Sequence, residues 1–408
     1  FRVRVDILGL NDLSPTNVTF TSLGVVHKAK VSGAFTLDVD NGTTIALVPT
    51  ITISSVERFR TADRSSWVIT RPSIFNVTYF DQFRPRLTLE GLKPEFPVRV
   101  VEMVNGREHE TRSAGEWSEW VDSGSFVTLE RIVQGTPSLR FRTEDAVRWR
   151  ADIPFEGRVL YYQQWKVSIS VRNVPYANPV GVTFWQNGQS FTQYVHAETW
   201  SDWIDHGTAV SLTREALGST DSERWGTETT DFPVQRSESF TVTYMHQYWV
   251  TMVVEDLADA PTPLLNITQF NNTRQVPVTG QWGGWVDAAT EVSLPPTLAD
   301  GHGTRWLAHK STSELVQGAV TLTAAYTPEY RVSLAFTTAE GRALPAPLPS
   351  RVLLVGPEGD TTGVTSYDTL WLPAGVWRVA EVVWHGANIA PSLPAVFSPT
   401  PGGAWTIG

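Results

Sequence analysis

Three stretches of the sequence place two tryptophans and an aspartate at one fixed spacing. They read WSEWVD from Trp117, WSDWID from Trp200 and WGGWVD from Trp282. Such residues suit three kinds of chemistry: aromatic rings that stack on sugars, carboxylates that bind Ca²⁺, and aspartates that cap turns. The residues concerned are Trp117, Trp120, Asp122, Trp200, Trp203, Asp205, Trp282, Trp285 and Asp287.

The regular recurrence of these stretches favours a structural role. Trp117, Trp200 and Trp282 follow one another at a nearly constant interval. A related stretch, GAFTLDVDNG, carries Phe35 at the first tryptophan position, and the same interval separates it from Trp117. A catalytic site rarely returns at a fixed period, whereas a folding unit does.

A second landmark has the same period. Tyr79, Tyr161, Tyr244 and Tyr326 each begin a segment of the form Tyr-x-x-Gln/Glu-aromatic, and they recur at the interval of the tryptophans. The opening segment FRVRVDILGL matches the segment that starts at Phe83. The sequence therefore predicts five tandem repeats: repeat 1 (1–82), repeat 2 (83–164), repeat 3 (165–247), repeat 4 (248–329) and a divergent repeat 5 (330–408).

Each repeat opens with a strict alternation of apolar and polar residues. Phe1, Val3, Val5 and Ile7 alternate with Arg2, Arg4 and Asp6. This pattern is typical of half-buried antiparallel strands, and no long helical periodicity occurs. We therefore predict an all-β chain of five small antiparallel β-sandwich (Ig-like) domains. Because the connectors are short, these domains should form an elongated rod.

The tryptophan motif also carries structural predictions. Residues i and i+3 of a strand face opposite sides, so one tryptophan of each pair should be buried and the other should lie near the surface or a domain junction. The aspartate should cap the turn that follows it, where Gly124 and Gly207 can supply positive φ. Pro85 suggests an edge strand in repeat 2.

No catalytic motif emerges from the sequence. The pattern HExxH, the P-loop, GxSxG, GxGxxG and the EF-hand loop do not occur, and each repeated aspartate stands as a lone carboxylate. His302 and His309 form a weak metal pattern that ordinary loop histidines explain better. We expect no catalytic residue, no cofactor and no metal site.

Composition narrows the function classes further. The chain has 408 residues, a formal charge of −10 and no cysteine, so thiolate chemistry and disulfides are excluded. Basic and acidic residues are interspersed, which argues against nucleic acid as a partner, and no apolar run is long enough to span a membrane. The chain begins with Phe1 rather than Met, which suggests a processed or excised protein.

Five of the 12 asparagines lie in Asn-x-Thr sequons. This is an excess over chance, although accidental sequons in a Thr-rich β protein are the plain alternative. The alternation in FNVTY points Asn76 outward, which makes it the best glycan acceptor. The glycosylation candidates are Asn17, Asn41, Asn76, Asn266 and Asn271.

Taken together, the motifs resemble tandem β repeats of archaeal cell-surface proteins. The resemblance covers the Tyr-x-x-Gln/Glu segment, the paired tryptophans with Asp, and the Arg-Trp dipeptides at Arg148, Arg224 and Arg305. Similar repeats occur in S-layer-type proteins and beside secreted proteases of hyperthermophiles. The resemblance implies an extracellular β-sandwich array and transfers no catalytic residue.

We therefore expect a non-enzymatic structural component of the extracellular surface, which self-assembles into a surface layer (S-layer) or an extracellular filament. Two alternatives stay open: a glycan-binding adhesin stalk, and the non-catalytic repeat region of a larger secreted enzyme. The expected partners are other copies of the chain and N-linked glycans. Assembly is expected to use the first strand, through Phe1, Val3, Val5 and Ile7, as an open edge or apolar end surface.

Overall fold

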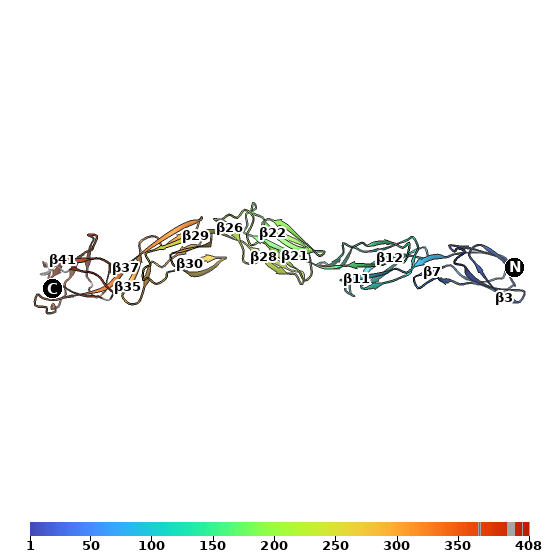
Figure 1. The fold of residues 1–408 in the computed structure, drawn as a ribbon, viewed down its shortest axis with the longest axis horizontal. Helices are drawn as coiled ribbons and strands as arrows, with labels where there is room; N and C mark the ends of the chain where they lie inside the picture. The colour runs from blue at the N-terminus through green and yellow to red at the C-terminus, as the bar shows by residue number, and fades with distance from the viewer. Residues whose placement is uncertain (366, 368, 390–395, 402, 408) are drawn as a thin grey trace.

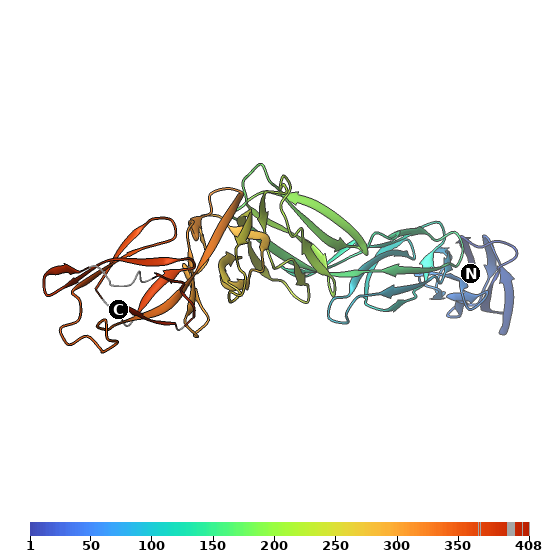
Figure 2. The same cartoon turned by 60° about the vertical axis from the view of Figure 1, so that its left-hand side comes forward.

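The computed structural model describes all residues except 366, 368, 390–395, 402 and 408. Throughout this part of the chain, every regular element is a β-strand. The chain runs in residue order along the long axis of the molecule, from the N-terminus at one end to the C-terminus at the other (Figure 1). A second view confirms the elongated shape (Figure 2). The all-β prediction is confirmed.

Repeats 1 and 2 are built from short strands. Repeat 1 contains β1 (Arg2–Leu8), β2 (Thr16–Ser22), β3 (Val25–Val31), β4 (Phe35–Asp38), β5 (Thr44–Leu47), β6 (Thr50–Thr52), β7 (Glu57–Arg60), β8 (Ser66–Val68) and β9 (Ser73–Thr78). β10 (Phe80–Phe83) leads into repeat 2, which contains β11 (Arg86–Glu90), β12 (Val98–Val104), β13 (Arg107–Ser113), β14 (Glu116–Trp117), β15 (Val121–Asp122), β16 (Phe126–Leu129), β17 (Ile132–Thr136), β18 (Leu139–Arg142), β19 (Arg148–Arg150) and β20 (Glu156–Leu160).

Repeats 3 and 4 open with longer strands. Repeat 3 contains β21 (Tyr162–Arg172), β22 (Val180–Gln186), β23 (Gln189–Val195), β24 (Thr199–Asp205), β25 (Ala209–Leu212), β26 (Glu223–Gly226), β27 (Asp231–Pro233) and β28 (Ser239–Thr243). Repeat 4 contains β29 (Met245–Glu255), β30 (Leu264–Gln269), β31 (Asn272–Pro277), β32 (Gln281–Asp287), β33 (Glu291–Ser293), β34 (Thr297–Ala299), β35 (Thr304–Ala308) and β36 (Ser313–Leu315).

A single strand, β37 (Val320–Phe336), joins repeat 4 to repeat 5. Repeat 5 then contains β38 (Arg351–Val355), β39 (Thr361–Val364), β40 (Leu370–Pro373), β41 (Trp377–Trp384), β42 (Ala387–Ile389), β43 (Val396–Phe397) and β44 (Ala404–Ile407). In repeat 5, β37 pairs antiparallel with β40 and parallel with β44, as β21 does with β24 and β28 in repeat 3, whereas the opposite sheet has the different order β39-β38-β41-β42.

Two sheets face each other in each of repeats 1 to 4. In repeat 3, β21 pairs with β24 and β28, while the opposite sheet has the order β23-β22-β25-β27. Repeat 1 repeats this plan with the sheets β4-β1-β9 and β3-β2-β5-β8. We call the hairpins β2-β3, β12-β13, β22-β23 and β30-β31 the outer hairpins.

One pairing differs from the antiparallel expectation. The first and last strands of a repeat are parallel, as in β1 with β9 and β21 with β28. Because the last strand continues almost directly into the next first strand, both must run in the same direction along the rod. Alternation in the sequence cannot reveal this, since it is the same for parallel and antiparallel partners of a half-buried strand.

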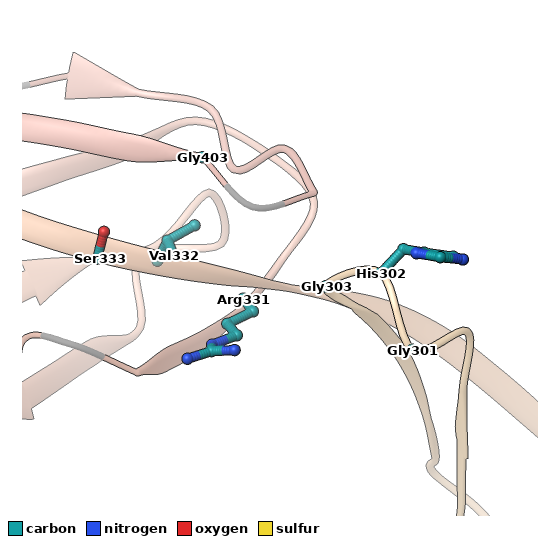
Figure 3. Close-up of a pocket in the computed structure, with 7 residues that line it drawn as sticks. All are labelled: Gly301, His302, Gly303, Arg331, Val332, Ser333 and Gly403. Atoms are coloured by element: carbon teal, nitrogen blue, oxygen red, sulfur yellow. The ribbon is translucent and has the colours of Figure 1, made fainter.

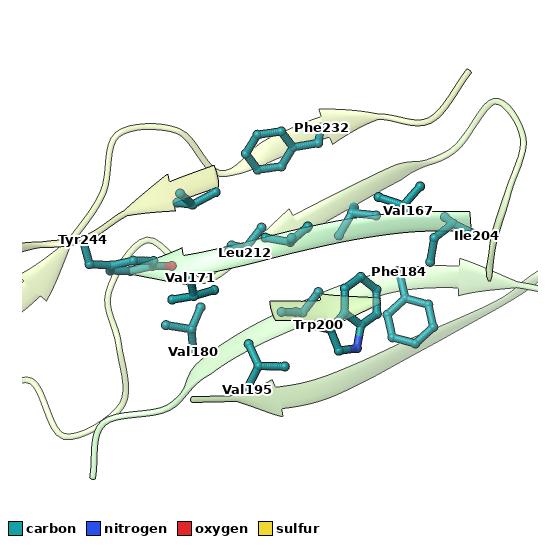
Figure 4. Close-up of a cluster of buried hydrophobic side chains, with 14 of the residues drawn as sticks. Val167, Val171, Val180, Phe184, Val195, Trp200, Ile204, Leu212, Phe232 and Tyr244 are labelled. Atoms are coloured by element: carbon teal, nitrogen blue, oxygen red, sulfur yellow. The ribbon is translucent and has the colours of Figure 1, made fainter. Parts of the chain in front are cut away.

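The core between the two sheets is apolar and separate in each repeat. In repeat 3 it is formed by residues from Val167 to Tyr244, including Phe184, Trp200 and Ile204 (Figure 4). Four further buried clusters lie within residues 3–79, 87–161, 250–326 and 332–397. Each cluster falls inside one predicted repeat, while the exact domain boundaries stay a prediction.

The repeated tyrosine closes each core in the same way. Tyr79, Tyr161 and Tyr326 are buried, and their hydroxyls donate to the carbonyls of Val48, Glu130 and Pro295 at 2.5–2.6 Å. Tyr244 donates to Thr213 in the same manner. Burial raises the pKa of all four phenols. The period of the tyrosines therefore reflects a buried hydrogen bond.

Two expectations about strand edges are corrected by the pairing. β1 lies between β4 and β9, and Val3, Val5 and Ile7 are buried in the core of repeat 1. Of the expected assembly residues, Phe1 alone is substantially exposed, at 44%. Pro85 lies between β10 and β11 and interrupts a central strand instead of marking an edge, because proline cannot donate to the ladder.

Candidate functional site: the junctions between repeats

The paired tryptophans divide between a core and a junction. Trp117 and Trp200 are 4% and 8% exposed and belong to the cores of repeats 2 and 3. Their indole N–H groups donate to Thr111 and Gln193 at 2.9 and 2.8 Å. Trp282 is half-buried against the core of repeat 4. The first tryptophan of each pair therefore serves packing.

The second tryptophan of each pair contacts the preceding repeat. The guanidinium of Arg58 lies 4.2 Å from the ring centre of Trp120, and Arg140 lies 4.5 Å from Trp203. Arg224 lies 4.4 Å from Trp285. A cation over an aromatic face is attracted by the ring quadrupole. An arginine of the same chain therefore covers one face of each ring, and that face is closed to stacking on a sugar.

The same arginines bind a buried glutamine on the strand that crosses the junction. Gln82, Gln164 and Gln247 are fully buried. Their Oε1 atoms accept from the Nε groups of Arg58, Arg140 and Arg224 at 2.9, 2.8 and 2.9 Å. Each arginine thus contributes a hydrogen bond to the strand that crosses the junction and a cation–π contact to a tryptophan of the following repeat.

The other end of each glutamine reaches the aspartate of the tryptophan motif. Gln82, Gln164 and Gln247 donate through Nε2 to the carboxylates of Asp122, Asp205 and Asp287 at 2.8, 2.9 and 2.8 Å. We call each set of Arg, Gln, Asp and second Trp a junction latch. The three latches form between repeats 1 and 2, 2 and 3, and 3 and 4.

Strand register places the latch residues in a row. Arg140 lies opposite Gln164 in the β18–β21 pair, and Gln164 lies opposite Asp205 in the β21–β24 pair. The other two latches have the same register across β7-β10-β15 and β26-β29-β32. Directly opposed residues in antiparallel strands have neighbouring side chains, so this row is a consequence of the ladder.

The aspartate caps a different turn from the one that the sequence suggests. The carboxylate of Asp122 accepts from the backbone N–H groups of Asn105 and Gly106 at 2.9 and 2.6 Å. Those residues form the tip of the outer hairpin β12-β13. Asp205 and Asp287 bind the tips of β22-β23 and β30-β31 in the same way. Gly124 and Gly207 do have positive φ, of 75° and 80°.

The electrostatics of a latch are balanced. A glutamine amide presents its oxygen to the cation and its nitrogen to the anion, so one neutral side chain bridges opposite charges. Burial lowers the pKa of Arg140 and Arg224, and it lowers that of Arg58 to about 10, which leaves the cation charged at neutral pH. The latch is therefore a satisfied polar network inside an apolar frame, the kind that specifies one geometry.

The junction between repeats 4 and 5 uses a modified version. Glu329 takes the place of the glutamine that lies between arginine and aspartate in the latches. Pro373 lies opposite Glu329, where the latches have the aspartate. Glu329 accepts directly from Arg305 Nε at 2.7 Å, and Arg305 lies 4.6 Å from the ring centre of Trp371. Where the aspartate is missing, Glu329 supplies the negative charge beside the arginine.

Repeat 1 contains the corresponding turn cap. Asp40 accepts from the backbone of Leu23 and Gly24 at 2.9 and 2.8 Å, and these bonds lower its pKa. Asp38 occupies the second tryptophan position and pairs with Arg2 at 3.5 Å. Phe35, at the first tryptophan position, is half-buried against the core.

Neither the arginine nor the glutamine of the latch was predicted from the sequence. The glutamine was visible as the fourth residue of the Tyr-x-x-Gln/Glu segment, and Arg140 precedes Phe141 just as Arg58 precedes Phe59. The Arg-Trp match was misleading for one member. Arg224 and Arg305 belong to latches, whereas Arg148 lies 3.8 Å over the ring of Phe126.

The sequons lie on the surface of their repeats. Asn17, Asn41, Asn76 and Asn271 are exposed. Asn266 is half-buried, and its side chain binds Ser293 and Gln275 at 3.4 and 3.0 Å. Glycan attachment at the five sites stays a prediction.

The described residues offer little for metal or small-molecule chemistry. Among them, no group of three His, Asp or Glu side chains is placed to hold a metal ion. A hollow of about 380 Å³ near the junction of repeats 4 and 5 is lined by Gly301, His302, Gly303, Arg331, Val332, Ser333 and Gly403. His302 and Arg331 point in different directions there (Figure 3). The hollow therefore lacks the converging polar groups of a ligand site.

Comparisons with known proteins assign this chain to no family. No protein-family profile and no curated protein matches the sequence. The Bacillus anthracis TIE protein is 8% identical over 87% of this chain and 71% of that chain, with a TM-score of 0.22. A streptococcal ancillary pilin is 10% identical over 60% of this chain and 99% of that chain, with a TM-score of 0.21.

A third solved structure is the pilus adhesin SpaC from Lactobacillus rhamnosus GG. It is 9% identical over 100% of this chain and 54% of that chain, with a TM-score of 0.17. Scores this low mean that the chains do not superpose as wholes.

Proposed function

We propose that this protein is a non-enzymatic structural rod of the extracellular surface, in which the five predicted repeats act as five domains. The observation that carries the proposal is the junction latch. It occurs three times with the same residue types and register, and a charge-adjusted form occupies the fourth junction. A spacer needs a fixed angle between neighbouring domains, and this network supplies one.

Backbone continuity supports stiffness as well. β21 pairs with β18 of repeat 2 at its beginning and with β24 and β28 of repeat 3 further along. One strand is therefore hydrogen-bonded to two successive repeats, without a flexible linker between them. A hinge at this point requires breaking ladder hydrogen bonds together with the latch.

Several features favour an extracellular location and assembly into a surface layer or filament. The exposed sequons suit N-linked glycans, and the repeats resemble archaeal surface repeats. The described part of the chain holds no helix long and apolar enough to cross a bilayer. Because β1 is paired on both sides, we place the assembly contacts elsewhere than at Val3, Val5 and Ile7.

Electron microscopy tests the proposal on native material. Antibodies against the chain should label the outside of intact source cells, and the purified protein should form layers or filaments. Intact-mass spectrometry should give a mass above 45.3 kDa, because of attached glycans. Labelling confined to the cell interior would overturn the surface assignment, and a bare polypeptide mass would remove the glycan part alone.

A further inference from the structure

The outer hairpins end in strands that lie at the edge of their sheets. β3, β13 and β23 each pair with the other hairpin strand on one side, and β31 does the same. An edge strand presents unpaired N–H and C=O groups, so natural sheets usually protect it with charge or proline. The four edges can be compared residue by residue, because the hairpins share one register.

The register of the β22-β23 hairpin identifies which groups are open. A two-residue turn at Asn187 and Gly188, with φ of 54° and 73°, makes Gln186 and Gln189 the first hydrogen-bonded pair. Alternation then turns the N–H and C=O of Ser190, Thr192 and Tyr194 away from β22.

Neighbouring contacts agree with this assignment. Gly181, which lies opposite Tyr194, exchanges hydrogen bonds with Thr213 on the other side of β22. Its polar backbone groups therefore point away from β23, as those of a non-hydrogen-bonded pair must.

Three of the four edges carry a protective residue at an open position. Lys28 in β3 and Glu110 in β13 stand where β23 has Thr192, as their pairing with Thr19 and Val101 shows. Antiparallel pairing of either strand with its own copy would oppose like charges, which is unfavourable. Pro277 in β31 stands where β23 has Tyr194, and it has no N–H to donate.

β23 lacks each of these devices. Its sequence, QSFTQYV, contains no acidic or basic residue, whereas β13 reads REHETRS. Two of its aromatic side chains are exposed although they sit on a sheet: Phe191 at 41% and Tyr194 at 60%. Phe191 packs on Phe184 with ring centres 5.9 Å apart, so its outer side is a continuation of the core.

We propose that β23 pairs antiparallel with β23 of a second copy of this chain. A twofold axis at Thr192 sets Thr192 opposite the same residue of the copy and Ser190 opposite Tyr194 of the copy. Three residue pairs then exchange two hydrogen bonds each. The arrangement is isologous, as most dimers are, and no charge is buried in a chain whose net charge is −10.

Pairing through β23 goes beyond the proposed function, because it does not depend on whether the protein lies at the cell surface. It places a contact on the side of the rod, in the third of the five predicted repeats. Two rods would then associate side by side rather than end to end. The small contact predicts a reversible, weak dimer.

Analytical ultracentrifugation of the full chain tests the pairing. The wild type should show a concentration-dependent monomer–dimer equilibrium. Thr192→Lys, which copies the device of β3, and Tyr194→Pro, which copies that of β31, should each weaken association at least tenfold. Gln275→Lys at the equivalent position of β31 is the matched control and should change nothing.

Hydrogen exchange supplies a second readout that does not depend on the variants. The amides of Ser190, Thr192 and Tyr194 should become protected as the protein concentration rises, while those of Phe191 and Gln193 are protected throughout. A wild type that is monomeric at every concentration would overturn the proposal, and so would exchange at the three open amides that ignores concentration. Association that survives both substitutions would place the contact on another surface and overturn it equally.

Discussion

The junctions and the outer hairpins differ in how much they vary from one repeat to the next. The latch keeps Arg, Gln, Asp and Trp in register at three junctions. The outer hairpins that the aspartates cap differ in residue type from one repeat to the next. Repeat 3 packs Phe184 on Phe191, while repeat 2 has Glu102 and His109 at the same two positions, 2.7 Å apart. The geometry between repeats is thus more uniform than the surface that each repeat presents.

The fourth junction shows what the constraint is. Loss of the aspartate to Pro373 accompanies a change of the bridging residue to Glu329, and the pairing with Arg305 is kept. Charge balance around the arginine is therefore the feature that the junctions share, and the glutamine is one of two ways to achieve it.

The largest effect is expected from placing the residue of the fourth junction into an intact latch. Gln164→Glu sets a second carboxylate beside Asp205, where the amide now donates at 2.9 Å. Two buried acids must then repel each other or bind a proton. We expect a loss of about 3 kcal/mol in the stability of the β21 region, measured by hydrogen exchange on the full chain.

A paired substitution controls for simple disruption. Adding Asp205→Asn to Gln164→Glu restores one carboxylate and one amide in the row, so part of the lost stability should return. The return is incomplete because the new amide nitrogen cannot accept one of the two hairpin-tip N–H groups that the carboxylate accepts. If the single variant is as stable as the wild type, charge balance does not govern the latch.

The reciprocal change should have a smaller effect. Glu329→Gln removes the ion pair with Arg305, whose side chain is 32% exposed, and Pro373 supplies no carboxylate to compensate. We expect a loss of about 1 kcal/mol at the junction of repeats 4 and 5, since partial solvation weakens the pair. Hydrogen exchange in β37 measures it, and a stabilised junction would refute the comparison.

The cation–π contacts should contribute less again. A double-mutant cycle with Arg140→Gln and Trp203→Leu should give a coupling energy of about 0.5–1 kcal/mol. The same cycle with Arg305 and Trp371 should give a similar value, because the two distances are 4.5 and 4.6 Å. A coupling of zero at both junctions would reduce the tryptophan to a packing residue.

The outer hairpin of repeat 2 should gain stability on mild acidification, whereas the junction variants above are expected to lose stability. Burial raises the pKa of Glu102, and its Oε2 has no hydrogen-bond partner among the described residues. An acid whose pKa is raised on folding stabilises the fold fully below its ordinary value of 4.5 and loses that contribution as pH rises through the folded pKa. Repeat 2 should therefore gain stability when neutral solution is mildly acidified.

Copying repeat 3 should remove this response. The double variant Glu102→Phe and His109→Phe should stabilise repeat 2 slightly at neutral pH and lose the gain on acidification. Hydrogen exchange in β12, corrected for the intrinsic effect of pH, measures both. A wild type that shows no gain in stability on mild acidification, like the variant, would contradict the assignment.

Local sequence patterns predicted the strands and the period of this molecule, but they could not predict which distant residues pair. Alternation and the period of Tyr161 and Trp200 indicated the strands, the repeats and the division of each tryptophan pair. The partners of Gln164 could not be read, because Arg140 and Asp205 lie 24 and 41 residues away and meet it through strand register alone. The same limit explains the expected open edge at β1, whose parallel partner β9 lies at the far end of repeat 1.

Latches that hold consecutive repeats at fixed angles should make the whole rod stiff. Small-angle X-ray scattering compares the wild type with a variant that carries Gln82→Ala, Gln164→Ala and Gln247→Ala, after circular dichroism has shown that both retain their strands. We expect scattering from one extended shape for the wild type and from a broad range of shorter shapes for the variant. Equal flexibility in the two proteins, or a wild type that already bends freely at every junction, would contradict it.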